Sequence, residues 1–89
     1  MSKRVAVLGI VLESAEETQA DLNAIVADFK GIVKGRMGIP FDEEGISVIS
    51  IILCGTLDEI NSLTGKIGNI RGVTVKTSIS KKEIESCRS

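Results

Sequence analysis

Two segments of the chain repeat one pattern, a strand followed by a helix and a second strand. The apolar run Val5–Leu12 corresponds to Ile46–Leu53, and Phe29–Val33 corresponds to Ile70–Thr74. Connections between strands of one sheet are short and right-handed, so a chain that repeats this unit has few arrangements open to it. The repeat therefore predicts one α+β domain with the element order βαββαβ.

The two most apolar segments are expected to be the central strands of the sheet. One, at about residues 3–12, is apolar on both faces, with Val5, Val7 and Val11 on one face and Leu8, Ile10 and Leu12 on the other. The other, at about residues 46–54, is apolar on both faces except at Ser47 and Ser50. A strand without a polar face is typical of the middle of a sheet.

The remaining two strands are more polar and are expected at the sheet edges. In residues 32–40, Lys34 and Arg36 share one face and Val33, Met37 and Ile39 share the other. Pro40 also favours an edge, and the acidic turn at residues 42–45 predicts an antiparallel hairpin with the next strand. The last strand, at about residues 73–80, is expected to turn Val73, Val75 and Ile79 inward and Thr74, Lys76 and Ser78 outward.

Each helix is predicted from a capping signal and an apolar stripe. Ser14 precedes Glu17, and Thr56 precedes Glu59, with the spacing of a capping box. The helices are expected at residues 15–29 and between residues 56 and 72, each ended by a glycine, Gly31 or Gly72.

These elements together predict a ferredoxin-like sandwich. The antiparallel sheet should have the spatial order 4-1-3-2, with both helices on one face. The domain is expected to span residues 1–80, and the polar tail at residues 81–89 is expected to be frayed or to add a short turn.

Two helices cover one face of such a sheet, yet the central strands are apolar on both faces. We therefore predict a homo-oligomer, a dimer or a tetramer, that buries the uncovered face. That face should include Ser50 or Ile49, according to the register.

The residue types argue against an enzyme. The 89 residues include no histidine, which removes most hydrolytic triads and imidazole metal sites. The cysteines, Cys54 and Cys87, do not form a CxxC motif. We expect a buried Cys54, a reactive exposed Cys87 and no structural disulfide, and we expect no catalytic residues, no metal and no cofactor.

Composition excludes two classes of partner. The formal net charge is −1, which provides no overall field to attract nucleic acid, and no apolar run has the length of a membrane span. We expect a cytoplasmic protein that binds neither nucleic acid nor membranes.

Arg36 is the most informative charged residue, because it stands in an edge strand. An arginine at a subunit boundary can bind a carboxylate or a phosphate, and a solvated or ion-paired arginine is the alternative.

The string Gly35-Arg36-Met37-Gly38-Ile39-Pro40-Phe41, followed by residues 45–51, resembles the family called the iron-only hydrogenase system regulator. The resemblance extends over nearly the whole chain. It implies an ACT-like regulatory domain, related in fold to the ligand-binding domain of the nickel-responsive repressor, that oligomerises and is linked to the [FeFe]-hydrogenase system. The repressor's metal site needs histidines and its DNA-binding segment is missing here, so neither nickel sensing nor DNA binding is carried over.

Two hypotheses for function follow. The leading one is a non-enzymatic, ACT-like regulatory homo-oligomer that senses a small molecule at a subunit interface, with a binding site that includes Arg36, Met37, Gly38 and Ser50. The alternative is an adaptor or assembly protein that binds a hydrogenase-maturation partner without a small-molecule ligand.

Overall fold

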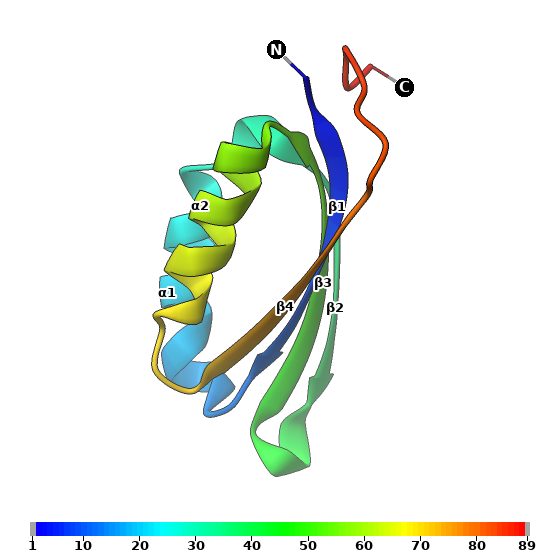
Figure 1. Ribbon diagram of the computed structural model, residues 1–89. Helices are drawn as coiled ribbons and strands as arrows, with labels where there is room; N and C mark the ends of the chain where they lie inside the picture. The colour runs from blue at the N-terminus through cyan, green and yellow to red at the C-terminus, as the bar shows by residue number, and fades with distance from the viewer. Residues whose placement is uncertain (1, 89) are drawn as a thin grey trace.

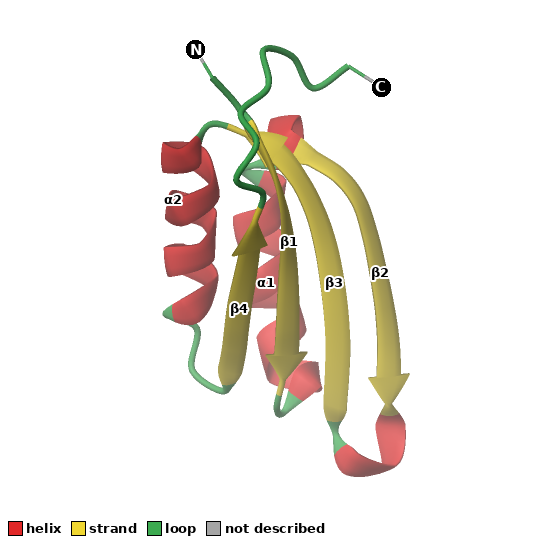
Figure 2. Ribbon diagram, turned by 45° about the vertical axis from the view of Figure 1, so that its right-hand side comes forward, coloured by secondary structure: helices red, strands yellow, loops and turns green. Residues whose placement is uncertain are grey.

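The computed structural model describes residues 2–88 and contains one sheet with a layer of helices (Figure 1). The elements are β1 (Arg4–Leu12), α1 (Ala15–Ala27), β2 (Val33–Phe41), β3 (Ile46–Gly55), α2 (Leu57–Gly68) and β4 (Val73–Ile79). Short 3₁₀ turns, η1 (Lys30–Ile32) and η2 (Asp42–Glu44), flank β2. The antiparallel sheet has the order β2-β3-β1-β4, and both helices lie on one face (Figures 1 and 2), so the predicted fold is confirmed.

The core lies between the helices and one face of the sheet. The central strands supply alternate residues, since successive side chains of a strand point to opposite faces. The fully buried large side chains are Leu8, Ile10 and Leu12 of β1, Ile49, Ile51 and Leu53 of β3, Leu22 of α1, and Ile60, Leu63 and Ile67 of α2. Each such aliphatic side chain contributes about 1.5–3 kcal/mol by leaving water.

One face assignment in β2 was wrong. Val33 pairs with Leu53 and packs against the core, whereas Met37 and Ile39 are exposed on the other side of the sheet. The cause is an irregularity in the register between Val33 and Gly35, which changes the alternation of faces at the start of the strand.

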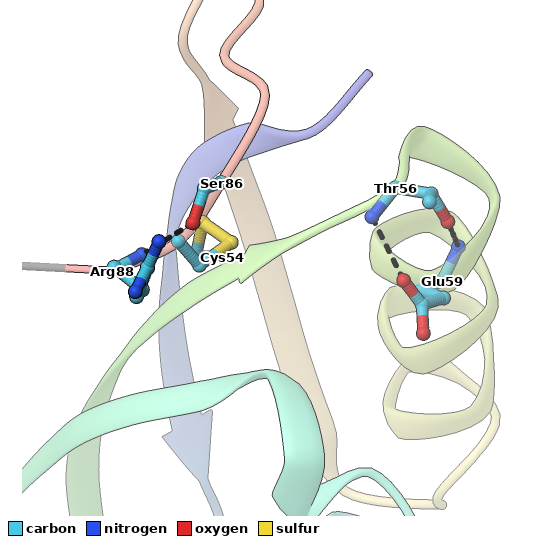
Figure 3. The surroundings of a disulfide bond; sticks show 6 residues. Cys54, Thr56, Glu59, Ser86 and Arg88 are labelled. Carbon is cyan, nitrogen blue, oxygen red and sulfur yellow. Dashed lines mark hydrogen bonds between the residues drawn. A yellow bond between two sulfur atoms is a disulfide. The ribbon is translucent and has the colours of Figure 1, made fainter. Parts of the chain in front are cut away.

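The two predicted capping boxes have different outcomes. At α2 the prediction is confirmed: the Glu59 amide donates to Thr56 Oγ1 at 3.2 Å, and the Thr56 amide donates to Glu59 Oε1 at 2.8 Å (Figure 3). At α1 it is wrong, because Ser14 has the left-handed backbone angles φ 53° and ψ 53° and its side chain makes no capping hydrogen bond. A capping residue needs an extended backbone to aim its oxygen at the first turn.

Thr56 also alters the acidity of the Glu59 side chain. Bonds from the backbone and hydroxyl of Thr56, in that order, lower the pKa of the Glu59 carboxyl below its ordinary value of 4.5. A carboxyl with a lowered folded-state pKa stabilises the fold above its unfolded-state pKa, and this contribution is lost as pH falls through the folded-state value.

Replacing Thr56 with alanine is expected to lower the free energy of unfolding by about 1 kcal/mol, because the cap of α2 is lost. Ser14→Ala is the matched control, since Ser14 has the same sequence spacing but caps nothing. It should change stability by less than about half as much. Urea unfolding at neutral pH measures both variants, and equal losses would contradict the assignment. The difference between Thr56→Ala and the parent should shrink as pH falls through the lowered folded-state pKa of the Glu59 carboxyl.

The predicted helix ends were also partly wrong. Helix α1 ends at Ala27, two residues before the predicted end at Phe29, and Gly31 has no left-handed backbone because it lies within the turn η1. Helix α2 ends at Gly68, and Gly72 lies in the turn before β4 with φ 84°. A Cβ at Gly72 would stand 3.3 Å from the carbonyl oxygen of Glu13, so this turn needs glycine both for its backbone angle and for the close approach.

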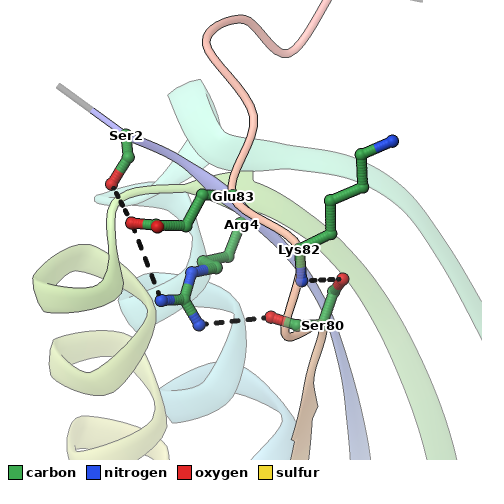
Figure 4. Close-up of polar contacts among 5 residues, drawn as sticks. All are labelled: Ser2, Arg4, Ser80, Lys82 and Glu83. Atoms are coloured by element: carbon green, nitrogen blue, oxygen red, sulfur yellow. Dashed lines mark hydrogen bonds and ion pairs between the residues drawn. The ribbon is translucent and has the colours of Figure 1, made fainter.

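The tail after β4 is neither frayed nor an added turn, which corrects the prediction. Lys3 and Ile84 form an antiparallel bridge with reciprocal backbone hydrogen bonds of 2.8 and 2.9 Å. Around it, Glu83 accepts a hydrogen bond from Ser2 at 2.8 Å and forms an ion pair with Arg4 at 3.8 Å (Figure 4). The tail therefore continues the pairing with the first strand beyond the end of β4.

A disulfide between Cys54 and Cys87 corrects a second prediction. The Cα atoms of the two residues lie 5.8 Å apart, within the range that a disulfide spans. Cys87 is therefore no free thiol, and the expected fast labelling of Cys87 and slow labelling of Cys54 do not apply to the oxidised protein. The prediction failed because it treated the tail as unattached, whereas the tail returns to the end of β3.

No helix within residues 2–88 has both the length and the apolar character needed to cross a membrane.

Candidate functional site

The face of the sheet opposite the helices, called here the open face, carries a broad apolar surface. Figure 2 shows the sheet from this side, with α1 behind the strands and α2 at the left, beyond β4. The exposed large apolar side chains here are Val5, Val7, Val11, Met37, Ile39, Phe41, Val48 and Ile52. Each is between 37% and 65% exposed, so eight apolar side chains are in contact with water on one side of a small domain.

The apolar surface has a defined edge. The strand register aligns Val11 with Thr74, Gly9 with Lys76 and Val7 with Ser78. The open face of β4 is therefore polar, as the sequence predicted, whereas the open faces of β1, β2 and β3 are mainly apolar. The polar row on β4 marks one side of a surface suited to burial against another sheet.

The four predicted ligand-binding residues fall on the two faces of the sheet. Met37 and Ser50 are aligned across β2 and β3 on the open face. Arg36 and Gly38 are aligned with the buried residues Ile51 and Ile49, and therefore lie on the helix side. The structure brings the four residues together along the edge strand, but it divides them into two pairs with different surroundings.

Arg36 is held by helix α1. Its guanidinium donates a hydrogen bond of 2.7 Å to Oδ1 of Asn23. Both residues are exposed, because the helices do not reach over the whole of the edge strand. The contact leaves the other donors of the planar guanidinium free to bind a carboxylate or a phosphate.

A small hollow of about 240 Å³ adjoins Arg36 on the helix side. It is lined by Gln19, Arg36, Gly38, Pro40, Ser47 and Ile49. A larger hollow of about 650 Å³ shares Gln19, Pro40 and Ser47 with it and extends to Glu16, Glu17 and Asp42. The combined groove therefore has a cationic end at Arg36 and an acidic end beside the start of α1, an arrangement that suits a small molecule with both charges.

Sequence reasoning missed two polar residues of helix α1: Gln19, which lines both hollows, and Asn23, which accepts the hydrogen bond from Arg36. They are four positions apart in α1, so they lie on the same side of the helix. They also flank Leu22, which is buried. A polar pair at this spacing beside the apolar stripe was the signal available in the sequence.

Within residues 2–88, no three acidic or cysteine side chains gather in an arrangement that could hold a metal ion. The acidic residues near the groove are explained by the first turn of α1 and by the turn η2.

Comparison with solved structures relates this geometry to known folds. The structure of the uncharacterized protein TM1266 from Thermotoga maritima is 37% identical, with a TM-score of 0.84, and the match covers 89% of this chain and 99% of that one. The ACT domain from GTP pyrophosphokinase of Chlorobium tepidum is 19% identical, with a TM-score of 0.73, and the match covers 85% of this chain and 99% of that domain. The second likeness shows an ACT-like fold.

Comparison with curated protein sequences gave no match. Residues 4–77 match the model of a family described as "TM1266-like: Iron-only hydrogenase system regulator, putative". This match spans all four strands and both helices up to Thr77 in β4. The chain therefore belongs to the TM1266-like family of iron-only hydrogenase system regulators.

Proposed function

We propose that this protein is a non-enzymatic, ligand-sensing regulator of the iron-only hydrogenase system that works as a homo-oligomer. The observation that carries the proposal is the open face, where eight exposed apolar side chains lie on one side of an ACT-like sheet. Apolar patches of more than a few hundred Å² are rare on soluble monomers and usually mark an interface. The family description supports a regulatory role.

The occupant of the open face is proposed to be a second copy of the chain. A specific dimer buries roughly 1,200–2,000 Å² in total, or about half of that from each partner. The free chain has an accessible surface of 5884 Å². The open faces of β1, β2 and β3 would provide the part of this surface that each chain buries in the dimer. Two such faces can pack at the usual distance of about 10 Å between sheets.

The ligand is proposed to bind beside Arg36, and the edge strand would connect it to the interface. Arg36 faces the groove, and the next residue, Met37, faces the open side next to Ser50. A ligand that binds Arg36 and shifts its position would displace β2, and would so alter the contacts that Met37 makes with the partner subunit. Ligand binding and assembly would then be linked by a coupling free energy, which a sensor requires.

The proposed ligand class is a small zwitterion, such as a free amino acid, because the groove has charges of both signs. A thermal-shift screen with amino acids, nucleotides and iron–sulfur metabolites tests this. A ligand present at about 100 times its Kd stabilises the folded state by about 2.7 kcal/mol. For a domain of this size the midpoint should rise by roughly 10 °C or more.

Arg36→Gln should abolish the shift, whereas Arg71→Gln, which removes an exposed arginine outside the groove, should retain it. A shift that survives Arg36→Gln would place the ligand elsewhere. No shift with any compound would contradict sensing and would leave the adaptor hypothesis, in which the open face binds a hydrogenase-maturation protein.

The absence of catalysis is part of the same proposal. It is supported by a chain without histidine, in which Arg36 and the amides of Gln19 and Asn23 are binding groups rather than nucleophiles or general bases. The cytoplasmic location remains a prediction.

A further inference from the structure

The Cys54–Cys87 disulfide lies where a small reagent can reach it. Cys54 is only 6% exposed, but Cys87 is partly exposed. Both cysteines line a hollow of about 570 Å³ at the end of the sheet. Figure 3 shows the disulfide at the end of β3, with the tail passing beside it. An open hollow next to a disulfide is the access that a thiol needs to attack a sulfur atom.

The hollow is positively charged. Lys3, Lys34 and Arg88 line it, together with one acidic residue, Glu59. The Glu59 carboxylate is already occupied, since it accepts a hydrogen bond of 2.8 Å from the Thr56 amide in the capping box. The excess of positive charge favours a small molecule that carries carboxylates.

The disulfide also determines where the end of the chain lies. As far as Ile84 the tail is held by its bridge to Lys3 and by the contacts of Glu83. Within the described chain, the Cys54–Cys87 disulfide is the one covalent or polar contact that joins residues 85–88 to the rest of the fold. The Arg88 amide donates a hydrogen bond to Ser86, which belongs to the same segment. Breaking the disulfide would therefore release this short segment while the rest of the fold stays intact.

The position of the released segment matters because it covers one end of the open face. Cys54 is aligned with Val5, one of the exposed residues of that face. In Figure 1 the tail that follows β4 lies on the side of the sheet away from the helices. The disulfide thus fixes residues 85–88 at the end of the surface that the sheet leaves open.

We propose that Cys54–Cys87 is a thiol–disulfide exchange site for an anionic low-molecular-weight thiol of the glutathione class, and that exchange docks and releases residues 85–88. This inference is independent of the ligand groove and of self-association. It requires only the disulfide, the charged hollow and the path of the tail.

The exchange is balanced in electrons and protons. A small thiolate attacks Cys87 Sγ, the S–S bond breaks, and Cys54 leaves as a thiolate that takes up a proton. A second small thiol attacks the mixed disulfide and releases the Cys87 thiol. Two small thiols are thereby oxidised to one small disulfide, and the protein receives two electrons and two protons.

The test follows the reduction of the oxidised full-length protein by glutathione, with alkylation of released thiols and mass spectrometry. A double variant, Lys34→Gln with Arg88→Gln, should react with glutathione roughly three- to tenfold more slowly than the parent. The control, Lys66→Gln with Lys76→Gln, removes the same charge from α2 and β4 and should react at the parental rate. With cysteamine, a cationic thiol, the Lys34/Arg88 variant should react faster than the parent.

The docking and release of residues 85–88 are tested by a second measurement. Backbone NMR relaxation of residues 85–88 should show an ordered segment in the oxidised protein and a flexible one after reduction. In the Cys87→Ser variant, residues 85–88 should be flexible even without reductant. In the Ser86→Ala variant, which keeps both cysteines, they should remain ordered. The proposal is overturned if the disulfide is reduced by glutathione no faster than the protein unfolds. It is also overturned if the two double variants react at the same rate with both thiols, or if residues 85–88 stay ordered after reduction.

Discussion

Replacing Ile52 with lysine is expected to leave the chain folded but to abolish its self-association. Ile52 is 45% exposed on the open face, so in the free chain a lysine there reaches water without disturbing the core. In the proposed dimer the same ammonium would be buried between two sheets without a partner. Two such charges should raise the dissociation constant by about 1,000-fold or more, equivalent to about 4 kcal/mol.

The neighbouring residue provides the comparison. Ile51 is fully buried against the helices, and Ile51→Lys is expected to unfold the protein, since an unpaired charge in the core costs more than most small domains can lose. Thr74→Lys is the control on the open face. Thr74 lies in the polar row of β4 beside Lys76, so a lysine there should change neither stability nor assembly by much.

Sedimentation velocity at micromolar concentration, with circular dichroism as the check on folding, separates these outcomes. The parent and Thr74→Lys should sediment as oligomers, and Ile52→Lys as a folded species near 9.5 kDa. A parent protein that sediments as a single 9.5 kDa species would refute self-association. An Ile52→Lys variant that remains oligomeric would move the interface away from the centre of the open face.

The strand pattern made most of the fold predictable. Two segments that are apolar on both faces had to be central, and a polar alternation such as that of β4 had to lie at an edge. The sequence left the register open by one residue, and the structure places Ile49 inside and Ser50 on the open face. That choice places the large aliphatic side chains Ile49, Ile51 and Leu53 of β3 beneath the helices, together with Leu8, Ile10 and Leu12 of β1.

Local signals were less dependable than the strand pattern. Ser14 and Thr56 have the same capping-box spacing, yet only Thr56 caps a helix. The Ala15 amide donates instead to the carbonyl oxygen of Gly45 at 3.0 Å. That contact links the start of α1 to the hairpin between β2 and β3, two regions far apart in sequence. A capping pattern carries no information about such tertiary contacts, and they decided the backbone at Ser14.

The candidate site shows the same division between local and tertiary information. The alternation of β2 already put Arg36 and Met37 on different faces, so the separation of the predicted binding residues was implicit in the sequence. The hydrogen bond from Arg36 to Asn23 could not be predicted in this way, because it depends on the position of α1 over the edge strand. The disulfide was also beyond local reasoning, because Cys54 and Cys87 are 33 residues apart and meet only through the return of the tail.

Removing that disulfide is expected to cause a large loss of stability. The bond closes a loop that contains α2 and β4, with a sequence separation of 33 residues. Cross-linking a loop of this length restricts the unfolded chain and stabilises the folded state by about 3.7 kcal/mol. For a domain of this size, the loss corresponds to a fall in Tm of roughly 15–30 °C.

Cys87→Ser is the variant of choice, because Cys87 lies in the partly exposed tail whereas a change at buried Cys54 would also disturb the end of β3. Differential scanning calorimetry at one protein concentration should show a low Tm for Cys87→Ser, with or without a phosphine reductant. The parent should fall to the same Tm only when reductant is added, and Ser86→Ala should behave as the parent. A parental Tm that does not respond to reductant would mean that the cross-link is not present in solution, since a chain without it has no bond for the phosphine to break.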